Sequence, residues 1–167
     1  MSKLVNLIIK FEKIFLYISG AFLGILALSV FYEVISRYVF NHPTIWANEI
    51  STYLLQFLVF FTMGFLLIEG EHIRVTFLIE RLKGKTRKAL EMINVSLVFI
   101  FAYVLIVYGF KFTLNAYTRE MASPTLLEVP LWIPYSFIPL GGVLLALAAI
   151  CAIIKIGISP NIEEGMK

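Results

Sequence analysis

The sequence contains few residues whose types and spacing could support catalysis or metal binding. It has two histidines, His42 and His72, a single cysteine, Cys151, and no aspartate. The two histidines belong to different loops, and metal or haem sites need several such ligands close together. No glycine-rich phosphate loop and no Ser or Cys nucleophile motif occurs either. The sequence therefore predicts neither an enzyme nor a resident cofactor.

The most informative charges lie at the end of an apolar segment. Glu33 and Arg37 are four residues apart, so they share one face of a helix and can form an ion pair with the acid on the N-terminal side. Two interpretations remain open, a solvated pair at a membrane interface and a contact with a partner protein. Trp46, which follows a turn over residues 41–44, fits the aromatic belt of such an interface.

A polar stripe follows directly. Asn48, Thr52 and Gln56 recur every four residues and so share one helix face, with Glu49 beside them. Lipid offers such groups no hydrogen-bond partner, so the stripe must face protein or water. It could line a path for a substrate or ion, or it could hydrogen-bond to neighbouring helices. Only one ionisable residue accompanies it, which favours the structural role.

Long apolar segments must position these residues. Hydrophobic residues make up 60% of the 167-residue chain and charged residues 15%, outside the usual range of soluble domains. A helix of about twenty residues crosses a hydrocarbon core of about 30 Å. The sequence therefore predicts an all-α integral membrane protein with a single domain. Its four transmembrane helices are expected at about residues 14–36, 46–69, 89–112 and 130–156.

The segment over residues 72–88 mixes apolar and basic residues. We expect a short helix lying on the cytoplasmic membrane face, although a helical extension of the third transmembrane segment is an alternative. Its basic residues are predicted to contact anionic lipid headgroups. They are Arg74, Arg81, Lys83, Lys85, Arg87 and Lys88.

The distribution of positive charge predicts the orientation. Eleven of the fourteen Lys and Arg residues fall in the two terminal tails and the central loop. Positive residues are retained on the cytoplasmic side, so both termini are expected in the cytoplasm. The first apolar segment is longer than the core of a signal peptide, and we expect it to be a retained anchor. The net charge of +3 then reflects membrane anchoring, and no basic cluster interleaved with aromatics suggests nucleic-acid binding.

The fourth segment carries two further features. Pro130, Pro134 and Pro139 predict an irregular or kinked entry into this helix. Gly142 and Ala146 form a small-residue face for a helix neighbour.

Several motifs together resemble the small membrane subunit of tripartite ATP-independent periplasmic (TRAP) transporters, the DctQ-like family. The strongest is RYVFNHP at residues 37–43, followed by Trp46 and Glu49. The resemblance continues through Gly64 into EHIRV at residues 71–75, and it returns at Ser123-Pro124 and at PLWIP over residues 130–134. Members often have an aspartate after HIRV, where this chain has Thr76.

The resemblance implies a heteromeric, sodium-driven importer in a bacterial or archaeal cytoplasmic (inner) membrane. A soluble periplasmic protein would capture an organic acid, such as a dicarboxylate, sialic acid, or a related carboxylate or sulfonate. A large permease subunit would bind sodium and carry the substrate, while the chain itself binds no cofactor and serves as a scaffold. Its candidate contacts with the large subunit are Glu33, Arg37, Trp46, Asn48, Glu49, Thr52, Gln56, Gly142 and Ala146. Arg119 and Glu128 are candidate contacts with the binding protein.

A self-sufficient four-helix exporter acting as an oligomer is the main alternative, and a membrane redox or enzymatic subunit is a more distant one. Coupled transport normally needs a buried carboxylate or a broken helix near the middle of the membrane. Every glutamate is expected at or beyond the end of a transmembrane segment, which argues against the exporter. The sequence does not identify the transported substrate.

Overall fold

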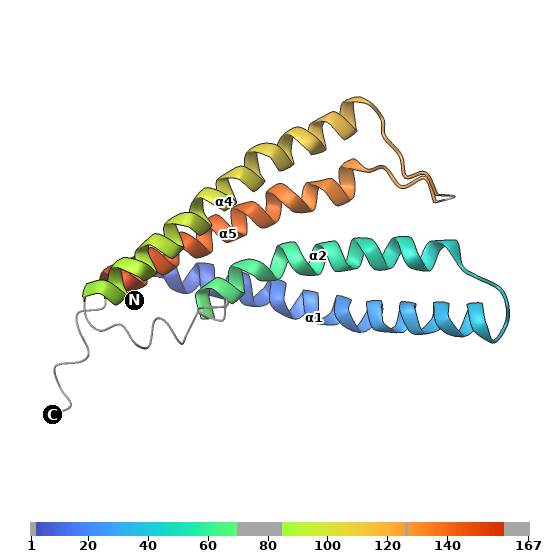
Figure 1. Cartoon of the computed structure of the whole chain (residues 1–167), viewed down its shortest axis with the longest axis horizontal. Coiled ribbons are helices and arrows are strands. Elements are labelled where there is room, and N and C mark those ends of the chain that lie inside the picture. Colours follow the sequence, from blue (N-terminus) through green and yellow to red (C-terminus); the bar gives the residue numbers. More distant parts are fainter. Residues whose placement is uncertain (1–2, 70–84, 126, 159–167) are drawn as a thin grey trace.

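The structure is a computed structural model that describes residues 3–69, 85–125 and 127–158 as four long helices and their connections (Figure 1). The helices are α1 (Lys3–Tyr38), α2 (Ile45–Glu69), α4 (Lys85–Thr118) and α5 (Trp132–Ile158). Each is long and apolar enough to cross a membrane. In these residues the only strand-like pairing is an isolated bridge between Ala122 and Pro130. The prediction of an all-α membrane protein with four transmembrane helices is confirmed.

The helices form a row and not a closed four-helix bundle. α5 packs on both α4 and α2, and α2 packs on α1, whereas α4 makes no comparable contact with α1 or α2 in the described part of the chain. Figure 1 shows the pairs α1–α2 and α4–α5 approaching each other near the N-terminus and diverging toward the two connections. We call the end with the α1–α2 and α4–α5 connections the loop end, and the opposite end the terminal end.

Small residues bring the helices of the core together. The core cluster consists of Leu67, Val95, Ala102, Leu145, Ala148 and Ala149. At Gly141 of α5, a Cβ would lie 2.5 Å from the backbone oxygen of Phe60 in α2, so the two backbones approach closely. Because lipid is as apolar as a side chain, such close approach is a main source of helix association in membranes.

The predicted small-residue face of the fourth helix is used inside the chain. Gly142 is buried against Ile106 of α4, and Ala146 packs on the core cluster. The helix neighbours of this face therefore belong to the chain itself. These two residues were candidates for contact with another subunit, and in the structure Gly142 is buried and Ala146 half-buried within the chain.

The prolines interrupt α5 less than expected. Pro134 lies in its first turn, where a missing N–H is no loss, and the helix continues through Pro139. The ring of Pro139 packs on Gly109 of α4, where a Cβ would lie 2.9 Å from the proline Cδ. The segment before Trp132, which contains Pro130, is not helical, whereas Pro134 and Pro139 both lie within the helix.

Two helices begin earlier than the apolar segments that predicted them. α1 starts at Lys3 and α4 at Lys85, so α4 continues the third transmembrane helix into the predicted interfacial segment. The part of that segment before Lys85 lies outside the described residues. The same holds for Arg74, Arg81 and Lys83, and for the side chains of Lys85, Arg87 and Lys88.

Candidate functional site: the loop end and the open faces of α1 and α2

Glu33 ties the end of α1 to the start of α2. Its Oε1 accepts hydrogen bonds from Arg37, from Nη2 at 2.5 Å and from Nε at 3.0 Å. Its Oε2 accepts one from the backbone N–H of Thr44 at 2.9 Å and another from the Thr44 hydroxyl. The predicted Glu33–Arg37 ion pair is confirmed. Glu33 is only 12% exposed but Arg37 is 52% exposed, so the arginine retains free surface for a further contact.

The turn between α1 and α2 has a defined shape. Asn41 adopts φ 51°, a left-handed conformation that asparagine tolerates better than most residues. The His42 N–H donates to the Ser36 carbonyl at 2.9 Å, and the Ser36 hydroxyl donates to the His42 carbonyl at 2.5 Å. The turn predicted at residues 41–44 is confirmed, and Trp46 just beyond it packs against Tyr32 at 5.8 Å between ring centroids.

Glu49 ties α2 to the connection between α4 and α5. Its carboxylate is buried and accepts a hydrogen bond from the Tyr53 hydroxyl at 2.6 Å and another from the Thr125 hydroxyl. The Thr125 hydroxyl lies 3.0 Å from that of Ser123. Glu49 is a predicted subunit contact, but in the structure it is engaged within the chain and positions the α4–α5 connection.

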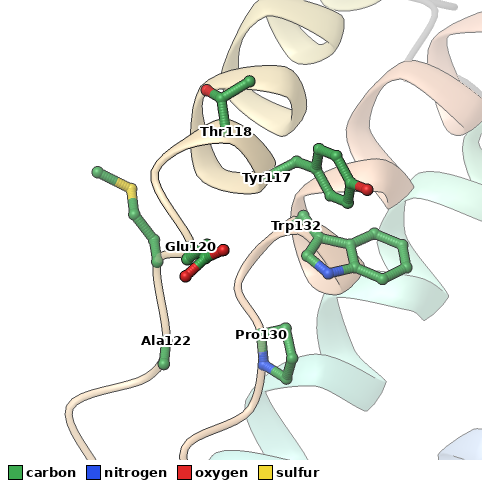
Figure 2. A pocket seen from close by; sticks show the side chains of 7 residues that line it. Tyr117, Thr118, Glu120, Ala122, Pro130 and Trp132 are labelled. Atoms are coloured by element: carbon green, nitrogen blue, oxygen red, sulfur yellow. The ribbon is translucent and has the colours of Figure 1, made fainter.

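A hollow of about 460 Å³ opens at the loop end, beside the ends of α4 and α5 (Figure 2). It is lined by Tyr117, Thr118, Glu120, Met121, Ala122, Pro130 and Trp132. The rings of Tyr117 and Trp132 stand at 86° to each other with centroids 6.1 Å apart. Figure 2 shows the Glu120 carboxylate between the chain leaving α4 and the chain entering α5.

Backbone hydrogen bonds fix the chain segments that line the hollow. The Met121 N–H donates to the Ala116 carbonyl at 3.0 Å and the Glu120 N–H to the Tyr117 carbonyl at 3.2 Å, which are the two bonds of a Schellman cap on α4. Glu120, at φ 49°, occupies the left-handed position of this cap. Beyond it the Leu131 N–H donates to the Met121 carbonyl at 2.9 Å, which holds the two sides of the connection together.

The two predicted contacts with a binding protein, Arg119 and Glu128, are both exposed at the loop end. Glu128 also has a left-handed backbone, at φ 45°, and its N–H donates to the Thr125 carbonyl at 3.1 Å. The structure therefore places both residues on the surface of the same connection.

The polar stripe of α2 is largely uncovered. Asn48 and Thr52 are exposed and Gln56 is half-buried. The Thr52 hydroxyl donates to the Asn48 carbonyl of its own helix at 2.9 Å. Leu55 and Val59 are exposed on the same side of the helix, at 52% and 50%. Within the described part of the chain, no other helix covers this face, which we call the polar face of α2.

α1 also has an open face. It packs on α2 through aromatic pairs, Phe15 with Phe61 at 5.0 Å and Phe22 with Phe57 at 4.8 Å between centroids. Gly20 and Gly24 are exposed, and a Cβ built at either would meet nothing within 4 Å. This pair of glycines is therefore not used in packing within the described chain.

Glu12 is a residue that the sequence analysis missed. Its side chain is fully buried, and a Cβ at Gly64 of α2 would lie 2.6 Å from its Oε1. Among the described residues neither carboxyl oxygen has a hydrogen-bond partner. The available signal was the seven-residue spacing of Val5, Glu12 and Ser19, which are all buried and share one face of α1. Glu12 lies toward the terminal end of α1 and not near its middle.

The sequence of the chain is similar to that of a known protein family. Residues 26–156 match the family described as "Tripartite ATP-independent periplasmic transporters, DctQ component". The chain is 28% identical over 101 residues to the C4-dicarboxylate TRAP transporter small permease protein DctQ of Rhodobacter capsulatus, covering 60% of this chain and 44% of that relative.

Two further relatives are more fully covered. The protein of the same description from Vibrio cholerae is 25% identical over 150 residues, which cover 77% of this chain and 65% of the relative. The ectoine TRAP transporter small permease protein TeaB of Halomonas elongata is 25% identical over 170 residues, which cover 97% of this chain and 85% of the relative. The chain thus spans less than two thirds of the length of the first two relatives.

Proposed function

The chain belongs to the DctQ component family of TRAP transporters, and we propose that it is the small, non-transporting scaffold subunit of a sodium-driven importer of organic acids. A large permease subunit would bind sodium and carry the substrate, and a soluble periplasmic protein would deliver it. Two of the relatives are named for C4-dicarboxylates, which supports an organic acid as the substrate.

The observation that carries the scaffold role is the polar face of α2. Asn48 and Thr52 lie inside a helix that is long enough to cross a membrane, yet no described helix of the chain covers them. The Thr52 hydroxyl bonds its own helix, but lipid tails cannot hydrogen-bond to the Asn48 amide, so a transmembrane helix of another protein is the expected cover. In this proposal the polar face of α2 contacts the large subunit, and the exposed part of Arg37 and Trp46 extend the contact to the loop end.

The loop end is proposed to face the periplasm, because eleven of the fourteen Lys and Arg residues belong to the opposite side. Arg119 and Glu128 would then be available to the binding protein. Docking must be transient if substrate is to be released, so a small polar contact is expected there and not a large apolar one.

The test compares two pairs of substitutions in the complete transporter. Asn48→Leu with Thr52→Val removes the polar face of α2. Asn94→Leu with Ser96→Ala is the matched pair on α4, where both residues are also exposed and the Ser96 hydroxyl likewise bonds its own helix. Interhelical hydrogen bonds in membranes contribute about 0.6 kcal/mol each, and up to about 1.7 kcal/mol. The α2 pair should therefore weaken co-purification of the large subunit about tenfold, while the thermal midpoint of the chain alone stays unchanged.

Three results would refute the proposal. The first is full co-purification and full uptake with the α2 pair substituted, and the second is an equal loss with the α4 pair. The third is sodium-driven uptake by vesicles that contain this chain alone, since a scaffold has no transport activity of its own.

A further inference from the structure

The hollow at the loop end has two aromatic walls. Tyr117 closes the last turn of α4 and Trp132 opens α5, and their rings meet at 86°. Both residues are exposed, at 63% and 40%, so they have surface left for a ligand. Proteins bind alkylammonium groups against aromatic rings because the negative face of a ring attracts the cation, and the exposed surface of Tyr117 and Trp132 can supply such a face.

A carboxylate completes the hollow. Glu120 occupies the left-handed position of the cap on α4, where glycine is favoured because any side chain is strained there. A glutamate at this position therefore makes the fold less stable than a glycine would. Its carboxylate places a negative charge in the hollow, between the two chain segments that line it (Figure 2). A hollow with aromatic walls and an acidic group selects a cation.

The depth of the hollow identifies the source of the cation. The candidate membrane spans of α4 and α5 end at Thr118 and begin at Trp132, so the hollow lies at the membrane-surface end of both helices. This is the level of lipid headgroups, where tyrosine and tryptophan are commonly found. α4 stands at the edge of the row and makes its main contact with α5 among the described helices, so lipid can reach the hollow from the side.

We propose that this hollow binds the ammonium group of a phospholipid with an ethanolamine headgroup. The ammonium lies against Tyr117 and Trp132 and pairs with the Glu120 carboxylate. The site does not depend on the scaffold role, because all of its residues belong to this chain and no other subunit is needed to form it. It also does not depend on which side of the membrane the loop end faces.

The test uses Trp132 as the reporter. In a Trp46→Phe background it is the only tryptophan. The full chain is placed in phosphatidylglycerol vesicles that contain a brominated phosphatidylethanolamine or the same lipid with its amine acetylated. Bromine quenches nearby indole fluorescence, and the two lipids differ only at the amine. An exposed ion pair together with a cation–π contact predicts a preference for the free amine on the order of fivefold.

Glu120→Gly and Glu120→Gln should both abolish this preference. The glycine variant also removes the backbone strain, so it should melt no lower than the parent and cannot lose the preference through unfolding. Glu128→Gln is the matched control, since Glu128 is a second exposed glutamate with a left-handed backbone in the same connection but does not line the hollow. It should keep the preference.

Native mass spectrometry of the unsubstituted chain provides a second measurement, in which phosphatidylethanolamine adducts should outnumber those of the acetylated lipid. Equal quenching by the two lipids in the parent protein would overturn the proposal. So would a preference that survives in Glu120→Gly, or one that is lost in Glu128→Gln.

Discussion

The close approach of α2 and α5 at Gly141 can be tested by a substitution. The test measures the free-energy cost of overlap between the two helices separately from the gain in helix propensity. Gly141→Ala adds a Cβ that would lie 2.5 Å from the backbone oxygen of Phe60 and 2.7 Å from its Cβ. Carbon atoms in good contact are about 3.5–4.0 Å from their neighbours. Because the nearest atom belongs to the backbone of a long helix, no side-chain rotation can relieve the overlap. The two helices must separate by about 1 Å.

The expected magnitude follows from a matched variant. Gly24→Ala lies in α1, where a Cβ would meet nothing within 4 Å. Both substitutions replace glycine by alanine inside a helix, so both gain helix propensity of up to about 1 kcal/mol. Overpacking a close contact costs about 1–3 kcal/mol. The difference in unfolding free energy between the two variants isolates that cost, and we expect Gly141→Ala to be the less stable by about 1–3 kcal/mol.

The assay is reversible unfolding of the chain alone in mixed detergent–lipid micelles, followed by circular dichroism. Gly24→Ala should be as stable as the parent or slightly more stable, because its helix gains propensity and loses no contact. Equal stability of the Gly141→Ala and Gly24→Ala chains would show that α2 and α5 do not approach each other as the structure has them. The reasoning from backbone proximity would then be refuted.

Two further predictions follow from the terminal end and from the charge distribution. Gly64→Ala should destabilise the chain, and Glu12→Ala should restore much of the loss in the double variant, because the three atoms nearest to the added Cβ all belong to the Glu12 carboxyl group. Equal losses with and without Glu12 would contradict this contact. The predicted orientation can be tested with single cysteines in a Cys151→Ala background. A cysteine at Leu127 should react with an impermeant thiol reagent added to whole cells, whereas one at Thr86 should not. The reverse labelling would refute the predicted topology.

The parts of the fold that depend on local sequence were predictable. Four helices follow from the length and apolarity of four segments, and the Glu33–Arg37 pair follows from a four-residue spacing. The turn at residues 41–44 follows from its composition. In each of these cases the information lies within a single segment of the chain, and no knowledge of its neighbours is needed.

The order of the helices in the row was not predictable by the same means. In a soluble protein the apolar face of a helix shows which side is buried, but in a membrane both the lipid side and the protein side are apolar. The decisive residues are then small ones such as Gly141 and Gly109, whose role depends on which partner they meet. Gly142 illustrates the difficulty, because its small-residue pattern predicted a helix neighbour but could not show that this neighbour is α4 of the same chain.

The two carboxylates that hold the loop end show the same limit. Glu33 bonds to residues close in sequence, and one of its partners was predicted. Glu49 accepts from Thr125, which lies in a different connection, and nothing near Glu49 in the sequence points to it. Glu12 was missed for a related reason. The first transmembrane helix was expected to begin at about residue 14, which left Glu12 outside it, whereas α1 begins at Lys3 and buries Glu12.

The row arrangement explains why the polar face of α2 is left uncovered within the described part of the chain. α1 and α5 pack on α2 from its two sides, so the rest of its surface must point out of the row. Glu33 fixes the start of α2 to α1, and Glu49 fixes it to the α4–α5 connection, so the helix cannot rotate about its axis to bury Asn48 and Thr52 without breaking these bonds. The exposure of the polar face is thus built into the fold by the same contacts that order the loop end. In the proposed complex, this outward polar face is the surface of α2 that contacts the large subunit.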